Sequence, residues 1–318
     1  MRLVFAGTPE VALPSLETLL DSRHDVAAVV TRPDARAGRG RGLRPSPVKQ
    51  RALEAGIEVL TPTTVRDPEF LDRLSAIAPD AAPVVAYGNL VPRAALDIPR
   101  HGWINLHFSL LPAWRGAAPV QHALIAGDTR TGASTFVLEE GLDTGPVIDT
   151  LAVDVGDDET AGELLDRLAT SGAQVLLRSL DALEDGTARP TPQTGTPTLA
   201  PKLTRDDARI DWRADSGRVR NLVRGCTPAP GAWTTLHGAP VKILRIDPVP
   251  GAVQGVVDDG LQPGRIRAGR SSVHVETGDG AVELVQVQPQ GKKAMAAADW
   301  ARGARVDGQR FDEETDDE

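Results

Sequence analysis

The chain has 318 residues, of which 41% are hydrophobic, 25% are charged and 3% are aromatic. This length predicts two domains with substantial cores, which excludes a disordered chain and a fibrous repeat. Cys226 is the only cysteine, so neither an intrachain disulfide nor a cysteine-based zinc cage can form. No apolar run reaches the roughly 18 residues of a membrane span, and the N-terminal apolar stretch is too short for a signal peptide. We therefore expect a cytoplasmic protein with no membrane partner.

Charge is distributed unevenly along the chain. The net charge is −9, but residues 1–201 carry −8, residues 202–311 carry +5, and residues 312–318 form an acidic tail. The tail is typical of a solvated chain end. A basic C-terminal half permits a polyanionic partner without requiring one.

Through the first half of the chain, short apolar runs alternate with stretches of helical spacing. The runs expected to form strands buried on both faces are residues 2–6, 26–31, 57–60, 81–86 and 103–107. The stretches expected to form helices are residues 12–20, 47–55, 68–77 and 120–126. Ser46 before Pro47 is typical of an N-cap followed by the first helical residue. This alternation predicts an α/β domain with a Rossmann-like, mostly parallel sheet covered by helices on both faces.

Farther along the chain the pattern changes. Residues 132–155 are β-rich, residues 160–184 predict one long amphipathic helix, and residues 186–201 are rich in Pro, Thr and Gly. Beyond them, short alternating runs predict strands at residues 233–236, 241–246, 254–257, 272–276 and 282–287, with short helices at 218–224 and 296–301. Many short strands indicate a small, OB-like β-barrel. We expect a catalytic domain at 1–185, a linker at 186–202, a β-barrel domain at 203–311 and the acidic tail at 312–318.

The densest group of chemistry-bearing residues ends the expected strand at 103–107. Asn105 and His107 are two residues apart, so on a strand their side chains point to the same side. Ligands of open α/β sheets bind outside the carboxyl ends of the strands. A carboxamide beside an imidazole can stabilise an oxyanion and handle a proton. A turn-forming asparagine and a buried structural histidine would also fit this pattern.

Two further segments favour the functional interpretation. Residues 112–119 form a loop whose Gly and Pro residues favour fixed turns. Asp143 lies in a glycine-flanked turn between two β-like runs, where a carboxylate could orient an imidazole. An ordinary Asx turn would fit Asp143 as well.

Together these residues resemble the tetrahydrofolate-dependent formyltransferases, and within them the branch that acts on methionyl-tRNA. The likeness rests on Asn105, His107, the segments 109–112 and 115–119, and residues 142–145. It extends over nearly the whole chain, from residues 5–9 to residues 290–295. One departure is Asn89, in the segment 87–92, where the family usually carries an apolar residue near the folate pocket.

The resemblance implies transfer of a formyl group from 10-formyltetrahydrofolate to initiator methionyl-tRNA, which gives N-formylmethionyl-tRNA for translation initiation. Asn105 and His107 would stabilise the tetrahedral oxyanion, and Asp143 would orient His107 and help remove the amine proton. Neither a metal nor a covalent enzyme intermediate is implied, and we expect a monomer. The segment expected to contact the folate is Ser109, Leu110, Leu111 and Pro112.

A basic loop at residues 31–51 supports a tRNA substrate. It carries a net charge of +6 within an otherwise acidic half, and its glycines leave the arginines free to contact phosphates. Phosphate contacts should dominate over aromatic stacking, because the chain has few aromatic residues. The residues expected to contact tRNA are Arg36, Arg39, Arg41, Arg44 and Lys49 in this loop, and Arg220, Arg224, Lys292 and Lys293 in the C-terminal half.

Two other functions remain open at this point. A formyltransferase for a small amine, such as a nucleotide-linked amino sugar, would keep Asn105, His107 and Asp143 but would not need the basic loop. A non-catalytic RNA-binding module would need the basic residues but not the three site residues. Formylation of charged tRNA distinguishes these alternatives.

Overall fold

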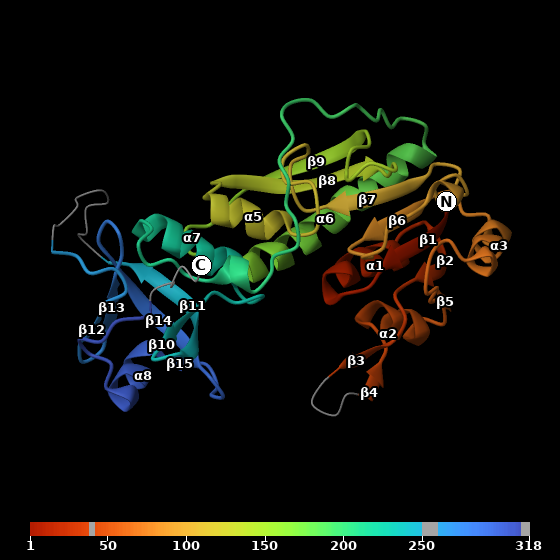
Figure 1. Cartoon of the computed structure of the whole chain (residues 1–318). Helices are drawn as coiled ribbons and strands as arrows, with labels where there is room; N and C mark the ends of the chain where they lie inside the picture. The colour runs from red at the N-terminus through yellow and green to blue at the C-terminus, as the bar shows by residue number, and fades with distance from the viewer. Residues whose placement is uncertain (38–41, 250–259, 313–318) are drawn as a thin grey trace. The chain divides into compact units, whose positions relative to one another are not determined.

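The computed structural model in Figure 1 describes residues 1–37, 42–249 and 260–312. Two compact units are present. The first unit contains residues 1–119, 130–154 and 165–200, and the second contains residues 120–129, 155–164 and 201–318. The sequence boundaries differ from this division in two places. The first unit includes most of the expected linker, and the second includes two short segments from the first half of the chain.

The first unit is built on a seven-stranded sheet in the order β5-β2-β1-β6-β7-β8-β9. Its strands are β1 (Arg2–Gly7), β2 (Asp25–Val30), β5 (Glu58–Leu60), β6 (Ala82–Val85), β7 (Trp103–His107), β8 (Arg130–Val137) and β9 (Val147–Asp154). The first five are parallel, whereas β8 and β9 each run antiparallel to the strand before them. The expected mostly parallel α/β sheet is therefore confirmed. From β1 the chain adds β2 and β5 toward one edge of the sheet, and from β6 it adds β7, β8 and β9 toward the other edge. The position between β1 and β6 is therefore a topological switch point.

Helices follow the strands. They are η1 (Glu10–Ala12), α1 (Leu13–Leu20), α2 (Pro47–Glu54), α3 (Pro68–Ile77), α4 (Arg93–Leu96) and α6 (Ala161–Glu184), whose first turn belongs to the second unit. All except η1 and the four-residue helix α4 correspond to helices that the apolar spacing predicts. The Ser46 hydroxyl accepts a hydrogen bond from the backbone N–H of Lys49, so the expected N-cap of α2 is confirmed. None of the described helices has a stretch long and apolar enough to cross a bilayer.

Close packing of α6 against the sheet fixes β7, the strand that carries the candidate site. A Cβ on Gly172 of α6 would lie 3.2 Å from the side chain of Leu106, so the helix approaches β7 closely. Ser179, farther along α6, is hydrogen-bonded to Thr135 of β8 at 2.6 Å. Trp103, the first residue of β7, is fully buried and donates its indole N–H to the Ala95 carbonyl at 2.7 Å. These contacts make β7 a rigid support.

A short hairpin lies in the basic loop. Its strands are β3 (Ala35–Ala37) and β4 (Gly42–Arg44), which pair antiparallel with Arg36 opposite Leu43. The sequence predicted a loop without strands here. Runs of three residues without apolar alternation give no strand signal. Arg39 and Arg41 lie outside the described residues.

The second unit is a curled, antiparallel half-barrel in the order β10-β11-β14-β13-β12, with β15 pairing β14. Its strands are β10 (Trp233–Leu236), β11 (Ala239–Pro248), β12 (Ile266–Ala268), β13 (Val273–Glu276), β14 (Ala281–Pro289) and β15 (Met295–Ala296). Its helices are α5 (Pro119–Ala126), η2 (Asp206–Ala208), α7 (Ser216–Cys226) and α8 (Ala297–Ala304). The small β domain is confirmed, and the strand expected at 254–257 lies outside the described residues. The core is closed by Phe311, which stacks between Trp212 and Trp300 with ring centroids 5.3 Å and 6.1 Å away.

Candidate active site

The site begins with Asn105, which lies in β7. This strand is flanked by β6 and β8, and Asn105 pairs with Val84 on one side and Phe136 on the other. The side chain is half-buried, and within the described part of the chain its amide has no hydrogen-bond partner. A half-buried amide with open donors is available to a substrate oxygen.

His107 ends the same strand and is buried, with 5% of its surface exposed. Its Nε2 lies 2.8 Å from the Trp114 carbonyl oxygen, and because a carbonyl can only accept, Nε2 carries the proton and donates. Burial lowers the pKa of His107, while the Asp143 carboxylate and the Trp114 carbonyl oppose that shift. In the neutral ring, Nδ1 is therefore the basic nitrogen.

Asp143 faces that nitrogen from the loop between β8 and β9. Its Oδ2 lies 3.8 Å from Nδ1 of His107 and accepts a hydrogen bond from the Gly116 backbone N–H at 2.8 Å. Asp143 has a φ of 51°, in the left-handed region that residues with a Cβ seldom occupy. Nearby, a Cβ on Gly145 would lie 1.8 Å from the Val137 carbonyl oxygen, so this turn requires glycine. The structure thus brings together the three residues that the sequence singled out.

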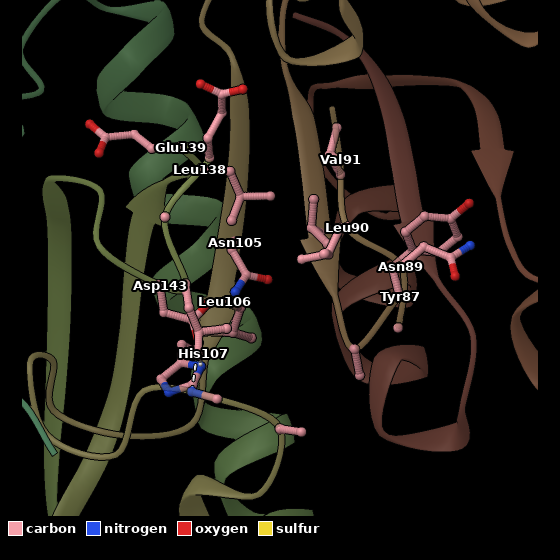
Figure 2. A pocket seen from close by; sticks show the side chains of 18 of the residues that line it. Tyr87, Asn89, Leu90, Val91, Asn105, Leu106, His107, Leu138, Glu139 and Asp143 are labelled. Carbon is pink, nitrogen blue, oxygen red and sulfur yellow. Dashed lines mark hydrogen bonds and ion pairs between the residues drawn. The ribbon is translucent and has the colours of Figure 1, made fainter. Parts of the chain in front are cut away.

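A cavity of about 640 Å³ opens in front of these groups. Figure 2 shows Asn105, His107 and Asp143 on one side of it and residues 87–91 on the other. The cavity lies at the carboxyl ends of β6 and β7, beside the switch point of the sheet, where ligands of α/β folds bind. Its remaining lining comes from Arg66, Val84, Ala86, Pro92, Leu106, Phe108, Gly116, Ala117, Pro119 and residues 138–142.

The segment Ser109–Pro112 does not line this cavity. The Ser109 hydroxyl donates to the Ala113 carbonyl at 2.5 Å, and the Ser134 hydroxyl donates to the Ser109 carbonyl at 2.7 Å. The segment instead fixes the turn that delivers the Trp114 carbonyl to His107. Sequence reasoning missed residues 138–142 as cavity lining. Because these residues immediately precede Asp143 in the chain, their position could have indicated that they line the same cavity.

The basic residues of the hairpin region differ in their surroundings. Arg44 is exposed on β4, whereas Lys49 donates to Asp34 at 2.7 Å and is only 23% exposed in its side chain. Lys49 is therefore partly neutralised by the single acidic residue of the loop. Arg36 lies on β3, so two of the five expected tRNA contacts here, Arg36 and Arg44, lie on the hairpin strands.

The basic residues of the second unit fall into two pairs. Arg220 donates to the Asp157 carbonyl and to the Asp158 carboxylate, and Arg224 donates to the carbonyls of Glu159 and Gly156. These guanidinium groups already hold a loop of their own unit, which leaves fewer N–H donors for a phosphate. The other pair, Lys292 and Lys293, lies exposed in the turn between β14 and β15.

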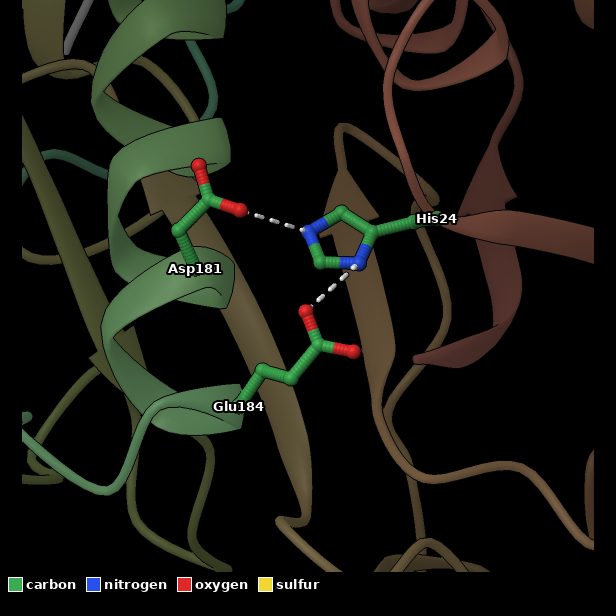
Figure 3. Close-up of side chains that lie close together, drawn as sticks. All are labelled: His24, Asp181 and Glu184. Carbon is green, nitrogen blue, oxygen red and sulfur yellow. Dashed lines mark ion pairs between the residues drawn. The ribbon is translucent and has the colours of Figure 1, made fainter.

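One histidine–carboxylate cluster in the described residues has donor atoms close enough for a metal ion. In Figure 3, His24 lies between Asp181 and Glu184 of α6, with Nε2 3.3 Å from Asp181 and Nδ1 3.7 Å from Glu184. Asp181 faces Nε2 and Glu184 faces Nδ1, so an ion bound to either ring nitrogen would lie beside only one of the two carboxylates. The amino group of Met1 donates to Glu184 at 2.6 Å. The cluster therefore ties the start of β2 to the end of α6.

The chain thus has an α/β fold in which an amide, an imidazole and a carboxylate line a cavity beside the switch point of the sheet. The family model described as formyl transferase matches residues 1–180, and the formyl transferase C-terminal domain model matches residues 202–305. The chain is 61% identical over 309 residues to the methionyl-tRNA formyltransferase of Streptomyces coelicolor, covering 96% of this chain and 97% of that one. It is 58% identical over 313 residues to that of Thermobifida fusca, covering 98% and 99%. The chain belongs to the formyl transferase family, in its methionyl-tRNA formyltransferase branch.

Solved structures show the same fold at much lower identity. The N-formyltransferase from Helicobacter canadensis in complex with folinic acid and dTDP-3-aminofucose has a TM-score of 0.68 and 17% identity, and the match covers 90% of this chain and 98% of that one. This likeness shows the fold alone. HypX from Aquifex aeolicus, whose structure was determined in complex with tetrahydrofolic acid, also shares the fold, with a TM-score of 0.62 and 17% identity over 98% of this chain and 48% of that one.

Proposed function

We propose that this chain transfers the formyl group of 10-formyltetrahydrofolate to the α-amino group of initiator methionyl-tRNA. The product is N-formylmethionyl-tRNA for translation initiation. The observation that carries the proposal is the convergence of Asn105, His107 and Asp143 on one cavity, in a chain 61% identical to a methionyl-tRNA formyltransferase over nearly its full length.

The cavity suits the flat, partly apolar ring system of a folate. Leu90 and Leu142 line it with 84% and 53% of their surfaces exposed, so both can offer apolar surface to a ring system bound there. Asn89 is half-buried on the same wall, so its polar side chain is compatible with the cavity. We place the folate between residues 87–92 and residues 138–143, with its formyl group toward Asn105. Ser109, Leu110, Leu111 and Pro112 then support the folate site through the loop that follows them.

In the chemical step, the neutral amine of the substrate attacks the formyl carbon and forms a tetrahedral intermediate with a negatively charged oxygen. The Asn105 amide donates a hydrogen bond to that oxygen. The new C–N bond leaves the attacking nitrogen positively charged, so it must lose a proton. N10 of the folate then leaves with the electrons of its bond to the formyl carbon and takes up a proton.

We assign the proton transfers to the pair formed by His107 and Asp143. Nε2 of His107 already donates to Trp114, so Nδ1 is the nitrogen that can accept the amine proton and return it to N10. The Asp143 carboxylate at 3.8 Å stabilises the imidazolium that forms in between. The neutral ring has no N–H left for the oxyanion, which assigns that role to Asn105 rather than to both residues. These steps need no metal ion, because the three side chains supply the oxyanion donor and the proton acceptor.

We further propose that tRNA is bound through the basic hairpin region and the β-barrel domain at 203–311. The exposed side chains of Arg44, Lys292 and Lys293 support this assignment, and the net charge of the hairpin loop supports it for Arg36, Arg39, Arg41 and Lys49. All three proposed catalytic residues come from one chain, so the proposed mechanism needs no residue from a second copy of this chain. Use of charged initiator tRNA supports a cytoplasmic location.

The test is incubation of the full chain with 10-formyltetrahydrofolate labelled in the formyl group and with methionyl-tRNA. Formation of labelled N-formylmethionine supports the proposal. A nucleotide-linked amino sugar in parallel serves as the competing acceptor. Label on the sugar and none on the tRNA would replace the proposed acceptor by a small amine.

A further inference from the structure

Residues 191–200, which we call the strap, run along the site rather than away from it. Thr191 pairs with Val147 of β9 through two backbone hydrogen bonds of 2.8 Å and 2.9 Å. At the other end, the Arg115 N–H donates to the Thr198 carbonyl at 2.9 Å, and the Ala200 N–H donates to the Arg115 carbonyl at 2.7 Å. The strap thus joins the start of β9 to the loop that carries Trp114. Its Pro, Thr and Gly composition predicted an extended linker instead.

Gln193 is the strap residue that reaches the site. Its Nε2 donates to the Asp143 carbonyl at 2.8 Å and to the Gly145 carbonyl at 2.9 Å. Its Oε1 accepts from Nε and Nη2 of Arg115, at 3.1 Å and 2.6 Å. Both ends of the amide are therefore occupied, and they connect the loop of Asp143 to the loop of Arg115.

The backbone of Asp143 needs such support. Its left-handed conformation is uncommon for residues with a Cβ, although Asp and Asn adopt it more readily than most, and contacts with neighbouring groups help to hold it. Gly116 holds the carboxylate, and Gln193 holds the carbonyl of the same residue. Because Gly116 follows Arg115 in the chain, the two contacts form a closed ring. Rotation of the Asp143 peptide would break the ring and move Oδ2 away from His107.

We propose that Gln193 is a positioning residue for formyl transfer, holding Asp143 in its left-handed conformation so that the carboxylate faces Nδ1 of His107. This inference rests on the proposed function of the site. Gln193 does not touch the reacting atoms and does not line the cavity. Its effect therefore passes through Asp143.

Two substitutions separate the two ends of the amide. Gln193→Ala removes every contact of the side chain. Gln193→Glu keeps an acceptor for Arg115 but has no N–H to donate to the carbonyls of Asp143 and Gly145. If positioning of Asp143 is what matters, both variants lose activity. If only the contact with Arg115 matters, Gln193→Glu stays active.

The experiment measures kcat, KM for both substrates, the pH profile and the melting temperature of the full chain. We expect both variants to lower kcat about 10- to 100-fold with KM changed less than about threefold, since small misplacements of a catalytic group carry penalties of this size. In Gln193→Ala, the acidic limb assigned to His107 should move to lower pH, because a displaced carboxylate supports the imidazolium less. A purely structural role would lower the melting temperature without moving that limb.

Thr191→Ala is the matched control, because it lies two residues away in the strap and keeps the backbone pairing with Val147. It should retain wild-type kcat. The proposal is overturned if Gln193→Glu has wild-type kcat, if Gln193→Ala leaves both kcat and the acidic limb unchanged, or if Thr191→Ala is equally damaged. Wild-type formylation of methionyl-tRNA in the same assay tests the proposed function separately, so the two failures are distinguishable.

Discussion

Replacing Asp143 by Asn tests the most specific geometric feature of the site. Asparagine tolerates the left-handed backbone conformation, and its side-chain oxygen can still accept from Gly116. The substitution therefore removes the negative charge while it keeps the shape. Two charges 3.8 Å apart interact by about 4 kcal/mol at an effective dielectric constant of about 20. Loss of about 2.7–4 kcal/mol from the transition state corresponds to a decrease in kcat of about 10²–10³.

The pH dependence supplies an independent measure of the same interaction. Burial already holds the pKa of His107 below its usual value, and the Asp143 carboxylate partly restores it. Without that charge the pKa falls further, so the neutral, basic ring persists to lower pH. The acidic limb of kcat/KM assigned to His107 should therefore move to lower pH in the variant. The amine of the substrate also titrates, but a substitution in the enzyme does not change its pKa.

The assay is the rate of N-formylmethionine formation under single-turnover conditions, followed from about pH 5 to pH 9. Asp72→Asn is the matched control, because it makes the same exchange at an exposed position of α3 that does not line the cavity. The control should keep the wild-type rate of formylation and the wild-type position of the acidic limb. A variant Asp143→Asn with kcat within about threefold of wild type, or with its limb moved to higher pH, would refute the electrostatic role of the carboxylate.

Four other outcomes follow from the sequence and the structure. Asn105→Ala should lower kcat about 10²–10³ with little change in tRNA affinity, and near-normal turnover would remove it from the oxyanion role. Neutralising Arg39 and Arg41 together should make the slope of log K for tRNA against log salt shallower by a little under about one unit per lost phosphate contact, with folate binding unchanged. Arg224→Ala should lower the melting temperature and leave that slope nearly unchanged, because its guanidinium already binds carbonyls of its own unit. Burial raises the pKa of Cys226 to about 12, so a thiol reagent at pH 8 should label it only after unfolding.

Much of the fold could be predicted because its signals are local. The strand at 103–107 and the helix beginning at Pro47 depend on apolar runs, side-chain caps and proline positions that are visible in short windows of sequence. The β3–β4 hairpin could not be predicted, because each strand has only three residues and the side chains of β4 are exposed. Its stability depends on backbone pairing, to which hydropathy is insensitive.

The candidate site shows the same division. The shared direction of Asn105 and His107 follows from the two-residue period of a strand, and the structure places both on β7. The distance between His107 and Asp143 depends on the pairing of β7 with β8 and on the turn before β9, which residue spacing does not determine. The contacts of Gln193 were invisible for a related reason, since a side chain that binds backbone carbonyls leaves no periodic pattern.

The strap also changes where the chain can be divided between relatives. A chimera joined at residue 185 would take residues 191–200 from the donor of the C-terminal half, and its Asp143 would then depend on a segment of the other protein. A junction after Ala200 would pass the strap on together with the sheet that it supports. An exchangeable first unit that keeps its own strap therefore ends beyond α6. Its last residue is Ala200, which pairs with Arg115.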